Sequence, residues 1–182
     1  MPLDIKKYNK FKMLKTGKIY SINISEENGV KKIPVNQAEI NQQGIAGDGH
    51  SGDWHRQVSL LSNESIENFN KSSNGKVNAQ PGDFGENITT SGISLSGLKP
   101  GDRLVFYPQP KQLRDNETIL EVTQIGKKCL EPCRIFYTVG SCIMPIQGIF
   151  CRVIKPGLIK KAYNIKISIT KKTDDKRGNI IL

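Results

Sequence analysis

The residues of this sequence most suited to chemistry are its four cysteines, which follow one another at C-x3-C-x8-C-x8-C. They are Cys129, Cys133, Cys142 and Cys151, and the first three lie in KKCLEPCRIFYTVGSC. Structural zinc sites take their ligands in two close pairs, whereas this spacing supplies one loose pair and two single cysteines. The pattern therefore argues against a zinc cage, and it favours a mixture of buried, inert cysteines and one activated thiolate.

Cations flank the first two cysteines. Lys127 and Lys128 stand before the first, and Arg134 follows Cys133 directly. Nearby positive charge favours a thiolate over a thiol, so a cysteine here is a candidate nucleophile or a candidate ligand to a soft metal. For Cys133 the residues leave a reactive thiol and a packed thiol equally open. The other three cysteines are expected to act as small apolar side chains in packing contacts.

A glycine-rich loop, GIAGDGHSGDWHR (residues 44–56), carries both histidines of the chain. Its polar residues are Asp48, His50, Asp53, His55 and Arg56. Three interpretations stay open for them. Carboxylates and imidazoles are ordinary metal ligands, and loop amides together with Arg56 would suit an anion such as phosphate. Alternatively, Asp48 and Asp53 cap turns while Trp54 anchors the loop in the core.

The length of the chain bounds its organisation. With 182 residues it is long enough for one domain with a hydrophobic core and too short to count on two, so a single domain over residues 1–182 is expected. The sequence has no apolar run of the kind found in signal peptides or membrane spans, which predicts a cytoplasmic protein with no membrane partner. Because cytosolic thiols are kept reduced, this location argues against a disulfide framework.

The formal net charge of +10 is carried by the two ends of the chain. Residues 1–18 hold six Lys and one Asp, and residues 155–182 hold eight Lys or Arg and two Asp, whereas residues 19–154 hold thirteen basic and fourteen acidic residues. Nucleic-acid grooves interleave aromatic and basic side chains on the folded surface, and the nearly neutral middle of the chain offers no such stripe. We therefore expect solvated basic arms and no nucleic-acid partner.

The elements that must position these residues are mostly strands. Alternation of apolar and polar residues predicts strands over 17–25, 118–125 and 163–169, a short strand over 57–61, and further short strands between 86 and 107. One helix is predicted after a cap at Ser62, with Ile66 and Phe69 on one face. Short strands joined by glycine and proline turns predict a mainly β, barrel-like fold with a few short helices.

Three successive segments resemble the motifs of the MOSC domain, a family named for the C-terminal domain of molybdenum cofactor sulfurases. They are GIAGDGHSGDWHRQVSLLSNESI, GDFGENITTSGISLSGLKPGDRL and EVTQIGKKCLEPCRIFYTVGSCIMPIQGIFCRVIKPG. The resemblance spans about residues 17–160, and its form is similar to stand-alone MOSC proteins of anaerobic bacteria and archaea. It departs from the family near the last strand, where PGLIKKAYNIKIS replaces the common Gly-Asp turn.

The resemblance implies a barrel-like β fold and a site for the molybdenum cofactor. The family's key cysteine, in a Pro-Cys setting after the EVT strand, corresponds to Cys133, with Cys129 as the second match. This residue is implied to be the catalytic cysteine and the molybdenum ligand, since a soft thiolate suits that metal. For the cofactor's phosphate tail the candidates are Arg56, His50 and His55, followed by Lys127, Lys128 and Arg134.

Two roles are compatible with such a thiolate. Active enzymes of the wider family reduce N-hydroxylated compounds, which here would require a separate redox partner because the sequence shows no electron-transfer module. Alternatively, the cysteine carries persulfide sulfur or hands the cofactor to a cofactor-biosynthesis protein. A non-catalytic module whose loop binds an anion remains the alternative to both.

Overall fold

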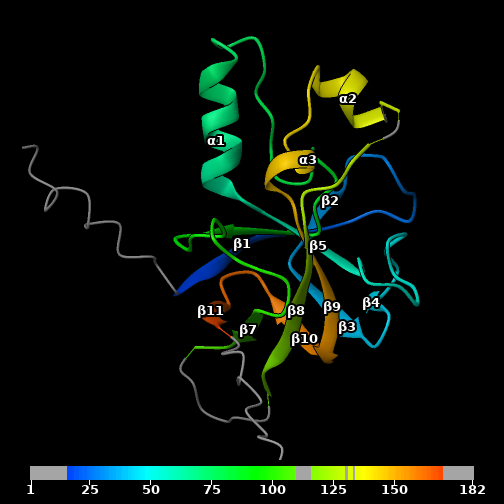
Figure 1. Cartoon of the computed structure of the whole chain (residues 1–182), viewed down its shortest axis with the longest axis vertical. Helices are drawn as coiled ribbons and strands as arrows, with labels where there is room; N and C mark the ends of the chain where they lie inside the picture. Colours follow the sequence, from blue (N-terminus) through cyan, green and yellow to red (C-terminus); the bar gives the residue numbers. More distant parts are fainter. Residues whose placement is uncertain (1–15, 110–115, 130, 133, 170–182) are drawn as a thin grey trace, which may run out of the picture.

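The fold is a seven-stranded β-barrel with three short helices, in a computed structural model that describes residues 16–109, 116–129, 131–132 and 134–169 (Figure 1). The barrel strands are β1 (Thr16–Ile24), β5 (Val58–Ser62), β6 (Ile88–Ser91), β7 (Arg103–Tyr107), β8 (Thr118–Ile125), β9 (Ile149–Lys155) and β11 (Asn164–Ser168). They run in the order β11-β7-β8-β9-β5-β6-β1, and antiparallel pairing of β1 with β11 closes the ring. The predicted barrel-like, mainly β fold is confirmed.

Four further strands of the described residues lie outside the barrel ring. Strand β2 (Ile33–Val35) pairs with the end of β1. Strands β10 (Gly157–Lys160), β3 (Gln37–Asn41) and β4 (Gly44–Ile45) form a separate antiparallel sheet in that order. The predicted strands over 17–25, 57–61, 118–125 and 163–169 are confirmed as β1, β5, β8 and β11.

One pair of barrel strands, β5 and β6, is parallel, while the other neighbours in the ring are antiparallel. Parallel neighbours need a crossover connection, and helix α1 (Asn63–Ser72) supplies it. Ser62 caps this helix as predicted, because its hydroxyl accepts a hydrogen bond from the Ser65 amide at 3.1 Å. Ile66 is the residue of α1 buried against the body of the protein.

The apolar core has two parts. One fills the barrel with side chains from most of its strands, including Ile22, Leu60, Phe106 and Val122. The other, which includes Phe84, Ile135, Met144 and Phe150, lies between the barrel and its helices. This second cluster joins β9 to α2 (Arg134–Val139) and α3 (Met144–Gln147), so it fixes the helices over one end of the barrel.

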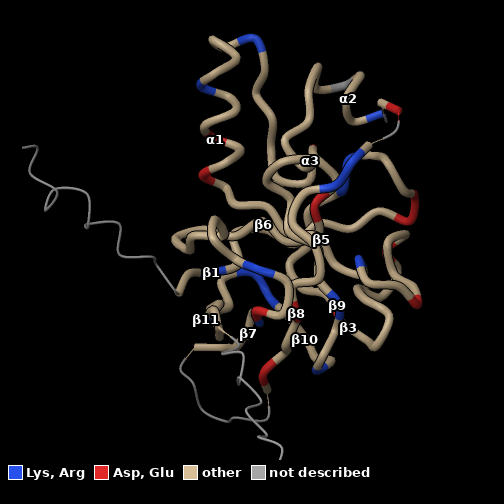
Figure 2. Tube along the Cα trace, in the orientation of Figure 1, with Lys and Arg blue, Asp and Glu red and all other residues tan. Residues whose placement is uncertain are grey.

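The helices gather at that end, and Figure 1 shows all three of them above the barrel strands. The segment that leads from β8 to α2 is basic, and its blue stretch lies beside α2 and α3 in Figure 2. Within the described residues, no helix has the length and apolar character that crossing a membrane requires.

Candidate functional site

A cavity of about 330 Å³ lies between this end of the barrel and the helices that cover it. Three cations, one carboxylate, one thiol and one imidazole line it: Arg56, Lys127, Lys128, Glu131, Cys129 and His50. Its apolar wall comes mainly from the second core cluster, namely Phe84, Ile135, Met144 and Phe150. The cavity therefore combines positive charge with a soft nucleophile over an apolar base.

A larger groove of about 830 Å³ runs between α1 and the turn after β6. Its lining is formed by isoleucine, leucine, serine and amide side chains, together with Glu64, which accepts a hydrogen bond from the Gly92 amide at 2.8 Å. Among the described residues that line it there is no Lys, Arg, His or Cys. We place the candidate site in the smaller cavity because the chemically competent side chains meet there.

The glycine-rich loop is tied to the end of β1 by Asp48. The carboxylate of Asp48 accepts hydrogen bonds from the amides of His50 (2.9 Å) and Ser25 (3.1 Å), so this residue caps the turn as one of the sequence interpretations proposed. Gly49 donates its amide to the Ser25 carbonyl at 2.8 Å. These bonds set the path of the chain toward the cavity.

Arg56 is held between two aromatic rings. Its guanidinium carbon lies 4.8 Å from the ring centre of Trp54 and 5.9 Å from that of Phe150. The Nε atom of Arg56 is buried, and the described residues offer it no hydrogen-bond partner. Trp54 is 39% exposed, so it supports Arg56 at the surface instead of anchoring the loop in the core. An arginine with a fixed position is suited to binding an anion, and because Nε is buried the contact would be made by the terminal nitrogens of the guanidinium.

His50 lines the cavity as a neutral imidazole. Burial, together with the positive charges of Lys32, Lys127 and Arg56, lowers its pKa to about 4, against the smaller opposing effect of Asp48. Its Nδ1 atom is 3.9 Å from the nearer carboxylate oxygen of Asp48, beyond hydrogen-bond distance, and it has no partner among the described residues. Nδ1 is itself buried, so the ring would meet a ligand through Nε2, without adding charge.

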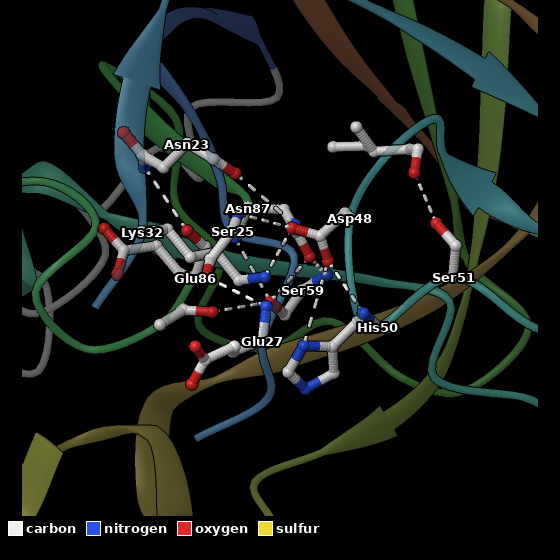
Figure 3. A network of polar contacts seen from close by, with 12 residues as sticks. Asn23, Ser25, Glu27, Lys32, Asp48, His50, Ser51, Ser59, Glu86 and Asn87 are labelled. Carbon is white, nitrogen blue, oxygen red and sulfur yellow. Dashed lines mark hydrogen bonds and ion pairs between the residues drawn. The ribbon is translucent and has the colours of Figure 1, made fainter. Parts of the chain in front are cut away.

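A buried polar network lies behind this wall (Figure 3). Lys32 and Asp48 form an ion pair, with 2.5 Å between Nζ and Oδ2. Ser59, which lines the cavity, donates both its amide and its hydroxyl to the side-chain oxygen of Asn87, each at 3.0 Å. Glu86 is fully buried next to Asn87. The polar interior thus begins at the cavity and extends into the barrel.

The structure brings together four of the residues named from the sequence: His50, Arg56, Lys127 and Lys128 all line the cavity. His55 points elsewhere, with its Nε2 atom 3.1 Å from the Gln124 side-chain oxygen, and it is not among the lining residues. Arg134 is also outside the cavity lining, and it pairs with Glu27 at 3.1 Å.

The cysteines divide in the same way. Cys151 is buried and Cys142 packs against the second core cluster, as expected of small apolar side chains. The same expectation is wrong for Cys129, because this residue is exposed and lines the cavity.

Cys133, the residue expected to be catalytic and to bind metal, lies outside the described residues. Within the described part of the chain, no three His, Cys, Asp or Glu side chains are grouped to hold a metal ion.

Sequence reasoning missed Lys32 and Glu86. Lys32 and Lys31 are adjacent, and two neighbouring lysines are normally both expected at the surface. Lys31 is exposed, but Lys32 is buried. Glu86 belongs to the GENITT segment, whose resemblance to a family motif was the one signal available for it.

Comparison with known proteins identifies the family. The model of the MOSC domain matches residues 47–166, which include the cavity-lining residues of the glycine-rich loop and of the segment after β8. No curated protein sequence gives a significant match.

Solved structures share the fold at low sequence identity. YuaD from Bacillus subtilis superposes with a TM-score of 0.67 and 21% identity, over 84% of this chain and 95% of that one. YiiM from Geobacillus stearothermophilus superposes with a TM-score of 0.62 and 18% identity, over 84% of this chain and 75% of that one. YiiM from Escherichia coli superposes with a TM-score of 0.57 and 18% identity, over 85% of this chain and 71% of that one. With the family model covering most of the described barrel, the chain belongs to the MOSC domain family.

Proposed function

We propose that this protein binds the molybdenum cofactor in the basic cavity, with a cysteine thiolate on the metal and cations on the cofactor's phosphate. The observation that carries the proposal is the meeting of Arg56, Lys127, Lys128 and Cys129 around one cavity. Membership of the MOSC family, which is associated with this cofactor, supports it. The cofactor would supply the redox chemistry when bound, and the protein would bind and orient it.

The residues present fit such a ligand. The volume of about 330 Å³ is at the lower end of the range for small-molecule sites, so part of the cofactor would remain outside the cavity. Arg56 lines the cavity with a planar guanidinium, which suits phosphate oxygens, while the two lysines add positive charge. Neutral His50 would add one hydrogen bond to a polar group of the ligand.

The thiolate is assigned to Cys133 on the strength of the family motif, with Cys129 as the second candidate. Cys129 lines the cavity, and Cys133 follows it by four residues in the sequence. A sulfur anion is a suitable ligand for a soft metal. The same thiolate serves transfer of cofactor or sulfur to a biosynthetic partner, or reduction of a small substrate with a separate redox protein. We propose a cytoplasmic location for both roles.

The test is the cofactor content of protein made in a host that synthesises the cofactor. Molybdenum is measured by mass spectrometry, and pterin by the fluorescence of its oxidation product. We expect wild-type protein to carry both and the Cys133→Ser variant to lose at least nine-tenths of the molybdenum. Cys142→Ser, which changes a cysteine outside the cavity lining, is the matched control and should resemble wild type.

Other outcomes are equally clear. Loss of molybdenum in Cys129→Ser with retention in Cys133→Ser would reassign the ligand. Equal molybdenum in all variants, or none in wild type, would refute thiolate ligation.

A non-catalytic anion-binding module is the second candidate, and the three cations Arg56, Lys127 and Lys128 on the cavity lining favour it. This function needs the cations and no thiolate. It predicts that wild type and the cysteine variants bind inorganic phosphate or sulfate equally well and contain no molybdenum.

A further inference from the structure

Glu86 is a fully buried carboxyl group with one unmatched oxygen. Its Oε1 atom accepts hydrogen bonds from the Gly82 amide and the Thr89 hydroxyl, each at 2.7 Å. Its Oε2 atom is buried as well and has no side-chain or main-chain hydrogen bond that meets normal geometry among the described residues. Burying an ionised carboxylate with an unpaired oxygen is costly, so this group is poised between its two protonation states.

The nearby charges do not neutralise it. Lys32 is the cation of the network, but it is already bound to Asp48 at 2.5 Å. One ammonium group, that of Lys32, thus serves two carboxyl groups. The net charge of Lys32, Asp48 and Glu86 together is zero when Glu86 is protonated and −1 when it is ionised. Burial, and to a smaller degree the charge of Asp83, raises the pKa of Glu86 to about 7.

Glu86 lies behind the wall of the cavity and is not itself exposed to it. Phe84 and Gly85, directly before it, both line the cavity. The wall is tightly packed, since a Cβ atom added at Gly85 would lie 2.8 Å from the Ile135 side chain of α2, and Gly85 also has a φ of 76°. The charged or titratable groups that line the cavity are His50, Arg56, Lys127, Lys128, Cys129 and Glu131.

We propose that the charge of Glu86 sets the affinity of this cavity for anions, so that the cavity binds an anion more tightly when Glu86 is protonated than when it is ionised. An ionised Glu86 would place negative charge behind a poorly hydrated wall, where it opposes the cations on the cavity lining. The inference rests on the proposed function, because it takes the cavity to be an anion site.

The test is the affinity of the intact protein for inorganic sulfate, measured by calorimetry between pH 5.5 and 8.5 at constant ionic strength. Sulfate keeps the same charge over this range, so a change in its affinity with pH reflects a change in the protonation of the protein. For wild type we expect the affinity to fall by about tenfold between pH 6 and 8, the size of one charge interaction of this kind. Glu86→Gln should bind at the tighter level throughout, since a glutamine can keep Oε1 on Gly82 and Thr89 and place its amide nitrogen where Oε2 was.

Asp83→Asn is the matched control, because it removes a neighbouring carboxylate that pairs with the exposed Lys31. It should keep the size of the wild-type pH dependence, with the midpoint moved slightly to lower pH because the charge of Asp83 no longer raises the pKa of Glu86. Sulfate affinity that is flat with pH in wild type, or equally pH-dependent in Glu86→Gln, would overturn the role of Glu86 and leave the anion site standing. Absence of sulfate binding at every pH would contradict the anion site itself and this inference with it.

Discussion

The ammonium group of Lys32 lies 2.5 Å from a carboxylate oxygen of Asp48, and their side chains are 1% and 0% exposed. Burial lowers the pKa of Lys32 despite its partner. For Asp48, burial alone would raise the pKa, but the hydrogen bond and charge of Lys32, with the amides of His50 and Ser25, outweigh it and lower the pKa. We treat the pair as ionised. Lys32 directly precedes β2, and Asp48 lies in the glycine-rich loop, so the pair connects these two segments.

Removing one member of this pair should strongly destabilise the fold. Lys32→Met leaves the Asp48 carboxylate buried without its counter-charge, and such losses cost about 3–5 kcal/mol. Urea titration at pH 7 measures the free energy of unfolding. Lys31→Met is the control, because this lysine is 65% exposed and its contact with Asp83 is 3.4 Å long. The control should change the free energy of unfolding by less than about 0.5 kcal/mol. Equal small effects of the two substitutions would show that the buried pair contributes little.

The stability of the protein should depend on pH through Glu86 and His50 with opposite signs. Folded Glu86 has a pKa of about 7 against an ordinary value of 4.5, so the folded state holds more protons in that window and loses stability as pH rises. Folded His50 has a pKa of about 4 against 6.5, so the unfolded state holds more protons and stability grows as pH rises through that window. Each effect amounts to about 3 kcal/mol, and in the wild type they largely cancel.

Single substitutions separate the two effects. In Glu86→Gln the free energy of unfolding should increase between pH 4.5 and 6.5, because the contribution of His50 remains. In His50→Asn it should decrease over the same range. Denaturant titrations at half-unit steps of pH would measure both slopes. Parallel profiles for the two variants would contradict the assigned protonation states.

The strands that sequence reasoning located are those with a clear period of two, such as β1 and β8, since one face of each packs inside the barrel. Strand β9 was missed because its first three residues are all buried, so IFCRVIK shows no clear alternation, and β2 and β4, with three and two residues, are too short to show a period. The route by which a barrel closes depends on contacts between residues far apart in the chain, such as Gly17 with Ile165.

The candidate site shows the same limit. Composition drew attention to the histidines and to the lysines beside Cys129, and four of the residues so named share a cavity. It could not say that His50 turns inward while His55, five residues later, contacts Gln124. The sequence also does not show which of the adjacent residues Lys31 and Lys32 is buried. Lys32 is buried because it pairs with Asp48, which lies sixteen residues later in the chain.

The thiols of the described cysteines should differ widely in reactivity toward a thiol reagent. Cys151 is fully buried, and burial, with a smaller contribution from Glu121, raises the pKa of its thiol well above the usual range, so almost none of it is thiolate in the folded protein. Cys129 is exposed at the cavity. In a Cys133→Ser background we expect one fast reaction, at Cys129, and no labelling of Cys151 until the protein is unfolded in urea.

Peptide mass spectrometry after timed labelling would assign each modified residue. Adding Cys129→Ser to the same background should remove the fast reaction and leave the labelling of unfolded Cys151 unchanged, which separates a change in accessibility from a change in the assay. Bound sulfate should slow the reaction at Cys129 if anions occupy the cavity, since the reagent and the anion would then compete for the same space. Fast labelling of Cys151 in the folded protein would contradict the packing of β9 in the barrel wall.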